Sequence, residues 1–228
     1  MKSPISLPVI FLCFVTSVGV AQKAPTPIFN ANHKNEWYTF LSESGKNHDP
    51  HAVFTFEGDV IHVSGEEFGY IATNKEYSNF HLRVEFRWGE KKYPPRVNDK
   101  RDAGILYHAD FYNGDKVWPR CLEYQIQEGD CGDVWMVDSV MVMHRGKQTT
   151  PMNWIRGQKE LNNEKPNGEW NTAEVIVNKG KFIHMLNGKK VNEGELINTQ
   201  KGHILLQSEG AEVFYRNASI REFTDKPR

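Results

Sequence analysis

The segment from Phe80 to Trp88 alternates strictly between apolar and polar side chains. All of its even-numbered residues are apolar, and the residues between them are His81, Arg83, Glu85 and Arg87. A period of two places successive side chains on opposite faces of a β-strand, so that one face packs against a core and the other meets water. The chain therefore has to build an antiparallel sheet with one polar face.

Further strand-like segments follow, and no segment has a helical period over ten or more residues. They read AGILYHAD, CLEYQIQ, NTAEVIV, KFIHMLN, GHILLQS and VFYRNASIREF. Turn signals at 178–180 and 187–189 bound the fourth of these segments, which predicts the middle strand of a meander. Many short strands without helices are typical of an all-β fold, a sandwich or jelly roll of two antiparallel sheets.

Composition narrows the range of partners. The 228-residue chain has a formal net charge of −1 and no block of Lys or Arg. A nucleic-acid partner would require a basic surplus to displace counterions, so we expect none. Hydrophobic residues make up 39% of the chain, which is enough to bury the core of a single β domain of this length.

The N-terminus has the layout of a secretory signal peptide. Lys2 precedes an apolar run from Ile5 to Val20, and small residues stand at Gly19 and Ala21. The sequence predicts a signal peptide over 1–21 with cleavage after Ala21, a short lead-in over 22–27 and one domain over 28–224. The run is short for a membrane span, so we expect an exported protein, periplasmic or extracellular, with no stable span after cleavage; an uncleaved anchor is the alternative.

Cys121 and Cys131 are the cysteines that remain after the leader. An exported protein can oxidise such a pair to a disulfide. Cys121 begins a predicted strand and Cys131 lies beyond its far end, which favours two buried free thiols instead.

Several predicted strands carry Glu, Gln, Arg and His on their polar faces. Alternation places Glu123 and Gln125 together on one strand, and Gln207 and Glu209 together on another. These side chains bind sugar hydroxyls well, whereas the polar face of an ordinary sheet is mostly Lys, Ser and Thr. Tryptophans supply candidate stacking surfaces for sugar rings, namely Trp88, Trp118, Trp135, Trp154 and Trp170.

Other polar groups permit more than one interpretation. Glu128, Asp130 and Asp133 have a spacing close to the paired acids of retaining β-glucanases, but two glycines interrupt them, and a solvated loop is the alternative. His108 and His144 lie in strand-like contexts, where a histidine is either a general base, a metal ligand or a buried structural residue.

The chain resembles the 3-keto-disaccharide hydrolase domain family. The resemblance runs over residues 28–223 and is carried in order by the segments VFTFEGDVIHVSGEEFGYIATNKEYSNFHLRVEFRW, RDAGILYH, CLEYQIQEGDCGDVW, GEWNTAEVIVNKGKFIHMLNGKKV and GHILLQSEGAEVFYRNASIREF. It implies a concanavalin A-like jelly roll, export, and action on glycosides already oxidised to a ketone at C3. The positions that match the family's polar sites are Glu85, Arg87, Glu123, Gln125, Asn187, Gly188, Gln207, Arg216 and Asn217.

The chemistry that this resemblance implies requires a base, an acid and a group that stabilises an enolate. A C3 ketone acidifies the C2 proton, so a modest base can start an elimination at C1, after which water adds. We expect Glu123 and His144 to share the base and acid roles, with His108 as the alternate. The expected substrate-binding residues are Glu85, Arg87, Gln125, Asp133, Trp135, Gln207 and Glu209.

A divalent metal on the enolate oxygen would serve the same purpose, and the sequence does not indicate its ligands. No nucleotide or organic cofactor is expected. A carbohydrate-binding module without turnover, or a retaining β-glucanase of the same fold, are the alternative functions.

Overall fold

The structure is a computed structural model that describes residues 24–223. The predicted signal peptide lies outside the described residues. Within them the fold is all-β, as predicted: apart from two single-turn 3-10 helices, η1 (Lys34–Glu36) and η2 (Arg96–Asn98), every regular element is a strand. The described part of the chain contains no helix with the length and apolar character of a membrane span.

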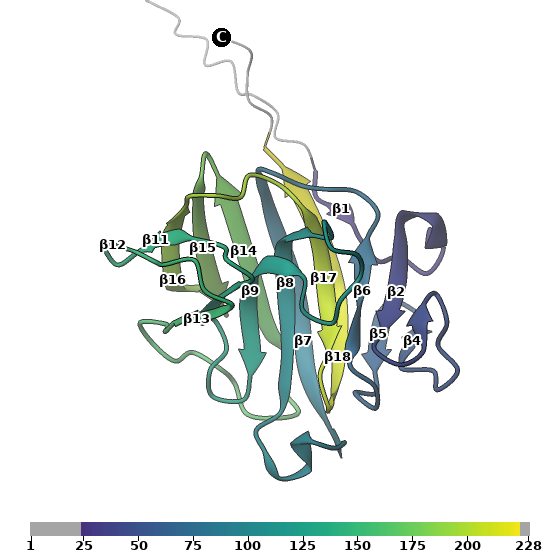
Figure 1. The fold of residues 1–228 in the computed structure, drawn as a ribbon. Helices are drawn as coiled ribbons and strands as arrows, with labels where there is room; N and C mark the ends of the chain where they lie inside the picture. Colours follow the sequence, from purple (N-terminus) through teal and green to yellow (C-terminus); the bar gives the residue numbers. More distant parts are fainter. Residues whose placement is uncertain (1–23, 224–228) are drawn as a thin grey trace, which may run out of the picture.

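Two antiparallel sheets lie one behind the other (Figure 1). The ten-stranded sheet has the order β12-β11-β16-β15-β14-β7-β18-β5-β4, with β1 added beside β18. Its strands are β1 (Thr26–Pro27), β4 (Phe54–Glu57), β5 (Val60–Val63), β7 (Phe80–Lys92), β11 (Val142–His144), β12 (Lys147–Gln148), β14 (Asn171–Asn178), β15 (Lys181–Leu186), β16 (Lys189–Leu196) and β18 (Ala211–Glu222).

The eight-stranded sheet has the order β13-β10-β9-β8-β17-β6-β2-β3. Its strands are β2 (Trp37–Leu41), β3 (Gly45–Lys46), β6 (Gly69–Thr73), β8 (Asp102–Asp110), β9 (Arg120–Gln127), β10 (Val134–Val137), β13 (Trp154–Gly157) and β17 (His203–Ser208). The segment 145–171, which has no clear period, contributes the short strands β12 and β13 to the edges of the two sheets.

The core lies between the two sheets. Phe80 and Phe86 of β7 point into it from the ten-stranded sheet, and Tyr107 and Leu122 enter from the eight-stranded sheet; all four are fully buried. The prediction that the apolar face of residues 80–88 packs against the core is therefore confirmed. Burying such side chains contributes about 1.5–3 kcal/mol each, which stabilises the stacking of the sheets.

The predicted meander is confirmed in β14, β15 and β16. The turns between these strands are tight, and each contains two residues with positive φ: Lys179 and Gly180 in the first turn, and Asn187 and Gly188 in the second. Positive φ at both central residues is the geometry that matches the twist of a two-residue hairpin, and Asn and Gly adopt it most readily.

A loop over residues 111–118, which we call the covering loop, packs on the outer face of the eight-stranded sheet. Its Asp115 accepts hydrogen bonds through Oδ1 from the hydroxyls of Tyr38 and Tyr70, at 2.8 and 3.1 Å. Phe111 packs with these tyrosines in a small apolar cluster on the same face. The covering loop thereby occupies the β2 and β6 side of this face and leaves the β8 and β9 side for a pocket.

Candidate functional site

A pocket of about 300 Å³ opens on the outer face of the eight-stranded sheet. Its volume is at the lower end of the range of small-molecule sites, about 300–1,000 Å³. Its lining comes from β8, β9, β10, β13, the loop around η2, the covering loop and the residue after β17. The lining residues are Arg96, Asp102, Trp118, Glu123, Gln125, Gln127, Trp135, Trp154 and Glu209.

Glu123 owes its position to the glycine on the neighbouring strand. Gly104 of β8 lies directly opposite Gln125 of β9, and a Cβ at Gly104 would meet Glu123 Oε1 at 2.2 Å and Gln207 Oε1 at 2.9 Å. The Glu123 carboxyl therefore folds over Gly104, in space that any larger residue would fill. Glu123 makes no hydrogen bond to another described residue, and only 4% of it is exposed.

Arg96 holds two further carboxylates at the edge of the pocket. Its guanidinium Nη2 lies 2.8 Å from Asp102 Oδ2 and also contacts Glu209 Oε1. The side-chain amides of Gln125 and Gln127 donate to the two oxygens of Asp102, at 3.1 and 2.6 Å. Asp102 and Glu209 are thus fixed by hydrogen bonds, whereas Glu123 is free to meet a ligand.

The three carboxyls of the pocket share one nearby cation, and their pKa values rise accordingly. Burial raises the pKa of Glu123 well above its usual range, the charges of Glu209 and Asp102 add to this, and Arg96 opposes it. Burial and then the charge of Glu209 raise the pKa of Asp102 to about 7. Burial also raises the pKa of Glu209. A carboxyl with a raised pKa keeps its proton to a higher pH and is a stronger base once ionised, which suits acid–base chemistry.

Two glutamines provide free polar atoms beside Glu123. Gln125 Oε1 is buried without a hydrogen-bond partner. Both polar atoms of the Gln207 side chain, Oε1 and Nε2, are also buried and also have no hydrogen-bond partner. Gln207 is fully buried and lies next to Glu123 above Gly104. Buried polar atoms are rarely left unpaired, so these atoms are candidates for binding the hydroxyl or carbonyl groups of a ligand.

Three tryptophans form the wall of the pocket. Trp118 comes from the covering loop, Trp135 from β10 and Trp154 from β13. The ring of Trp154 stands edge-on to both of the others, with centroid distances of 5.6 Å to Trp118 and 6.3 Å to Trp135. Indole faces around a polar floor are the usual means of stacking a sugar ring.

The structure places part of the predicted site in this pocket. Glu123, Gln125, Trp135 and Glu209 line it, and Gln207 lies directly beside Glu123. The period-two alternation predicted the glutamates and glutamines, because β9 and β17 are regular strands. Trp135 was predicted from its indole, as a stacking surface.

The two predicted histidines lie outside the pocket. His108 has φ of +51° at an irregularity of the β8–β9 pairing, which turns its ring into the core against Phe80 and Tyr107. Burial lowers the pKa of His108 to about 4, so it stays neutral. His144 belongs to β11 of the ten-stranded sheet, where its Nε2 lies 2.9 Å from Asn192 Oδ1. Neither histidine can share a substrate with Glu123 in this arrangement.

Glu85 and Arg87 also lie away from the pocket, on the outer face of the ten-stranded sheet. Glu85 accepts hydrogen bonds from Arg83 and Arg216, both at 2.7 Å. Arg87 packs over the rings of Trp170 and Phe214, at 5.1 and 4.8 Å from the centroids. The expectation that Glu85 shares one site with Glu123 and Gln207 is therefore wrong, because β7 and β9 belong to different sheets. Trp88 is buried in the core.

The acids that follow β9 stabilise a loop and do not reach the pocket. Asp133 is buried and accepts hydrogen bonds from Arg156 Nε at 2.5 Å and from the backbone N–H of Lys159 at 2.8 Å. Asp130 pairs with Lys100 and with Arg156, at 2.8 and 2.9 Å. The expected substrate-binding role of Asp133 does not fit this placement. Cys121 and Cys131 are free and buried, as expected.

Two charged residues of the pocket were missed in the sequence. Asp102 lies two residues before Gly104 and so shares its face of β8, which is a signal that alternation could have used. Arg96 lies in the loop after β7, and nothing local predicts that it reaches Asp102. Within residues 24–223 no group of three His, Cys, Asp or Glu side chains is arranged to hold a metal ion.

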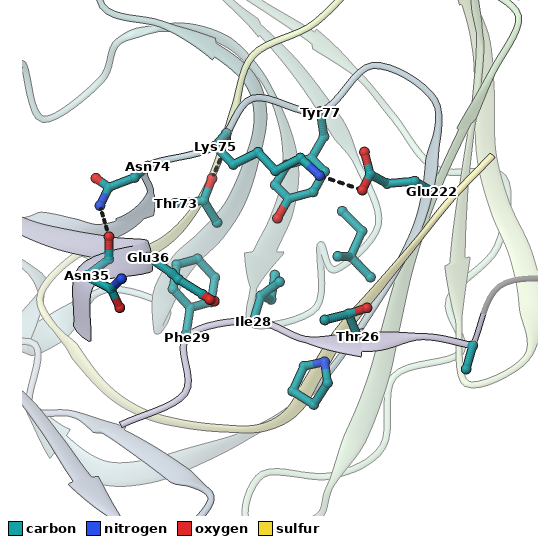
Figure 2. A pocket seen from close by; sticks show the side chains of 13 residues that line it. Thr26, Ile28, Phe29, Asn35, Glu36, Thr73, Asn74, Lys75, Tyr77 and Glu222 are labelled. Atoms are coloured by element: carbon teal, nitrogen blue, oxygen red, sulfur yellow. Dashed lines mark hydrogen bonds and ion pairs between the residues drawn. The ribbon is translucent and has the colours of Figure 1, made fainter. Parts of the chain in front are cut away.

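A larger cavity, about 490 Å³, lies beside β1 and is a weaker candidate. Figure 2 shows its polar groups bonded to one another: Lys75 pairs with Glu222, and Asn74 donates to the backbone of Asn35. Ile28 and Phe29 form its apolar part. No tryptophan lines this cavity, and of its two acids Glu222 is paired with Lys75, so it lacks the carboxyl cluster of the tryptophan-walled pocket.

The fold and the pocket together define a concanavalin A-like jelly roll with an acidic, tryptophan-walled site. Residues 24–221 match the model of a protein family described as the 3-keto-alpha-glucoside-1,2-lyase-like domain. The chain belongs to this family and is a carbohydrate-active jelly-roll protein. Comparison with curated protein sequences found no significant match.

Solved structures confirm the fold. A putative glycosyl hydrolase from Parabacteroides distasonis is 22% identical, with a TM-score of 0.57, and the match covers 83% of this chain and 89% of that one. The carbohydrate-binding module CBM66 from Bacillus subtilis is 9% identical with a TM-score of 0.55, covering 82% and 96%. A β-glucanase from Bacillus licheniformis is 9% identical with a TM-score of 0.54, covering 90% and 100%.

Proposed function

We propose that this protein is an enzyme that cleaves 3-keto glycosides by elimination across C1 and C2, followed by addition of water. The observation that carries the proposal is the free, buried carboxyl of Glu123 among two fixed carboxylates, on the floor of a tryptophan-walled pocket. Membership of a family described as 3-keto-alpha-glucoside-1,2-lyase-like supports the same chemistry.

In this mechanism Glu123 removes the proton from C2 of the sugar. The C3 ketone makes that proton acidic, and the ionised form of a carboxyl with a raised pKa is a stronger base than an exposed carboxylate. The C1–O bond then breaks, and the leaving oxygen takes the proton that Glu123 removed from C2. Water then adds across the C1–C2 double bond, with its hydroxyl on C1 and its proton on C2. Asp102 and Glu209 remain bound to Arg96 and set the charge around Glu123.

The glutamines orient the sugar and stabilise the enolate. Gln207 lies beside Glu123 above Gly104, and its Nε2 has no hydrogen-bond partner; an N–H donor there would stabilise the negative charge that develops on the C3 oxygen. Gln125 Oε1 is a free acceptor for a sugar hydroxyl. The sugar ring stacks on the indoles of Trp118 and Trp135, which also exclude water from the reacting carbons.

The shape of the site favours this reaction over the cleavage of a polymer. An endo-acting β-glucanase needs an open groove that runs across the sheet, whereas here the covering loop is bound to Tyr38 and Tyr70 and occupies one half of the face. The acids after β9, which suggested glucanase chemistry, are paired with Arg156 and Lys100. A binding module without turnover would use the same tryptophans, and it differs from an enzyme in that it releases no aglycone.

The predicted signal peptide adds a location to the proposal. We infer that the chain is exported and that its mature form, beginning near residue 22, acts in the periplasm or outside the cell. Its substrate would then be a glycoside that an oxidising enzyme has already converted to the 3-ketone.

Glu123→Gln tests the proposal directly. Gln has nearly the shape of Glu but cannot take a proton, so release of the aglycone from a 3-keto glucoside should fall by a factor of about 10²–10⁴. The measurement is the rate of aglycone release by the purified mature protein. Glu85→Gln is the matched control, because it makes the same chemical change on the outer face of the other sheet.

The proposal fails if Glu123→Gln and wild type release the aglycone at equal rates. If wild type binds the glycoside but releases nothing, the protein is a carbohydrate-binding module. Glu85→Gln should retain the wild-type rate.

A further inference from the structure

An exposed aromatic surface stands at the mouth of the pocket. Trp154 is 46% exposed although it packs edge-on against Trp118 and Trp135. It is held on β13, which pairs with β10 from Trp154 to Gly157, so its backbone is fixed in the sheet. A large exposed indole at the rim of a polar pocket is typical of a binding surface.

The polar groups of the pocket are concentrated on its floor. Glu123, Gln125 and Asp102 project from β8 and β9 and are buried, whereas Trp154 is exposed. Arg96 and Gln127 also line the pocket and are half-buried, and both are already bonded to Asp102. Arg156, the charged neighbour of Trp154 on β13, is already bonded to Asp130 and Asp133. A group that leaves the sugar toward the mouth therefore meets aromatic faces and few free hydrogen-bonding partners.

The volume of the pocket limits what it encloses. About 300 Å³ is small for a binding site, so the oxidised sugar ring occupies the floor and the rest of the glycoside extends outward. The leaving group on C1 must point to the mouth, because the floor is closed by Glu123 and the glutamines.

We propose that Trp154 forms a subsite for a planar, apolar aglycone, so that the preferred substrates are aryl 3-keto glycosides rather than disaccharides. This inference rests on the proposed function, since it names the group that the reaction releases. An aryl ring gains from stacking on Trp154 without leaving polar groups unpaired, whereas a second sugar would bring hydroxyls to a surface that offers few partners.

The test is a binding measurement in which no turnover occurs. Isothermal titration calorimetry compares Glu123→Gln with the double variant that also carries Trp154→Ala, using phenyl, methyl and glucosyl 3-keto glucosides as ligands. We expect the phenyl glycoside to bind Glu123→Gln about tenfold more tightly than the methyl glycoside, the scale of one aromatic contact. Trp154→Ala should abolish that difference.

Trp170→Ala in the same background is the matched control. Trp170 stacks on Arg216 at 3.9 Å on the outer face of the other sheet and should leave every affinity unchanged. Equal binding of the phenyl and methyl glycosides, or no binding of either, overturns the inference. So does a disaccharide that binds as tightly as the phenyl glycoside and depends equally on Trp154.

Turnover separates this inference from the proposed function. If wild type binds phenyl glycosides through Trp154 but releases no aglycone, the subsite stands and the proposed reaction is wrong. If wild type turns over 3-keto glycosides and Trp154→Ala leaves the preference among leaving groups unchanged, the reaction stands and the subsite is wrong.

Discussion

At the scale of single residues, Asp102 shows how the pocket prepares acid–base groups. Asp102 accepts hydrogen bonds from Gln125 and Gln127 and forms an ion pair with Arg96, and all three interactions favour its charged form. Burial and the nearby charge of Glu209 outweigh them, and the pKa of Asp102 rises to about 7. Such perturbed carboxyls are concentrated at functional sites, which supports the pocket as the reactive centre.

Asp102→Asn should remove the contribution of Asp102 to the pH dependence of the unfolding free energy. Because the folded-state pKa is raised from 3.8 to about 7, the stabilising contribution of Asp102 is complete below the unfolded pKa and is lost as pH rises through 7. Asn does not titrate, so the unfolding free energy of the variant relative to wild type should increase from about pH 4 to pH 8. Urea denaturation at several pH values measures this difference, and a constant difference over that range contradicts the prediction.

At the scale of elements, the covering loop decides how much of the sheet a substrate can reach. Asp115 joins the loop to β2 through Tyr38 and to β6 through Tyr70, and Lys46 of β3 pairs with its other oxygen at 3.3 Å. Both tyrosines are buried, so their hydroxyls depend on this carboxylate. The same loop supplies Trp118, and its attachment therefore also positions one wall of the pocket.

Asp115→Ala should release the covering loop. Two buried hydroxyls lose their acceptor, at a cost of about 1–3 kcal/mol in the unfolding free energy. Amide hydrogen exchange over 111–118 should become faster while exchange in β7 and β14 stays unchanged.

Lys46→Met is the matched control, since it removes the exposed partner of Asp115, and such pairs contribute only about 0–1 kcal/mol. Equal destabilisation by the two substitutions would show that the hydroxyl contacts do not secure the loop.

At the scale of the whole molecule, a buried hydrogen bond connects the two sheets. The hydroxyl of Tyr107 on β8 lies 2.9 Å from His184 Nε2 on β15. His184 Nδ1 lies 3.1 Å from the carbonyl oxygen of Gly132, which can only accept, so Nδ1 carries the proton and Nε2 accepts from Tyr107. Burial lowers the pKa of His184 to about 3 and keeps the ring neutral.

Tyr107→Phe should weaken the packing of the sheets without changing the pocket. It leaves a buried imidazole nitrogen unpaired, which costs about 1–3 kcal/mol in the unfolding free energy measured by urea denaturation. Tyr215→Phe is the control, because Tyr215 is equally buried but its hydroxyl reaches the backbone of Gln207 only at 3.5 Å. Equal losses from both substitutions would contradict a specific role for the bond between the sheets.

The sequence by itself determined the strands, the faces of the regular ones and the composition of the polar face of β9 and β17. These follow from the alternation of side chains, which is a local property of an extended chain. The alternation therefore predicted that Glu123, Gln125, Gln207 and Glu209 lie on the polar face of a sheet. The resemblance to the family extended this to the fold and the proposed chemistry.

Only the tertiary structure decided which polar faces meet. Glu85 alternates as clearly as Glu123, but β7 joined the other sheet, and no local pattern reports which sheet a strand enters. A single positive φ turned His108 into the core, and a loop brought Arg96 to Asp102 from outside the sheet. Strand pairing, bulges and loop closure depend on contacts between residues far apart in the chain, and those contacts placed the carboxyls, the cation and the tryptophans around one pocket.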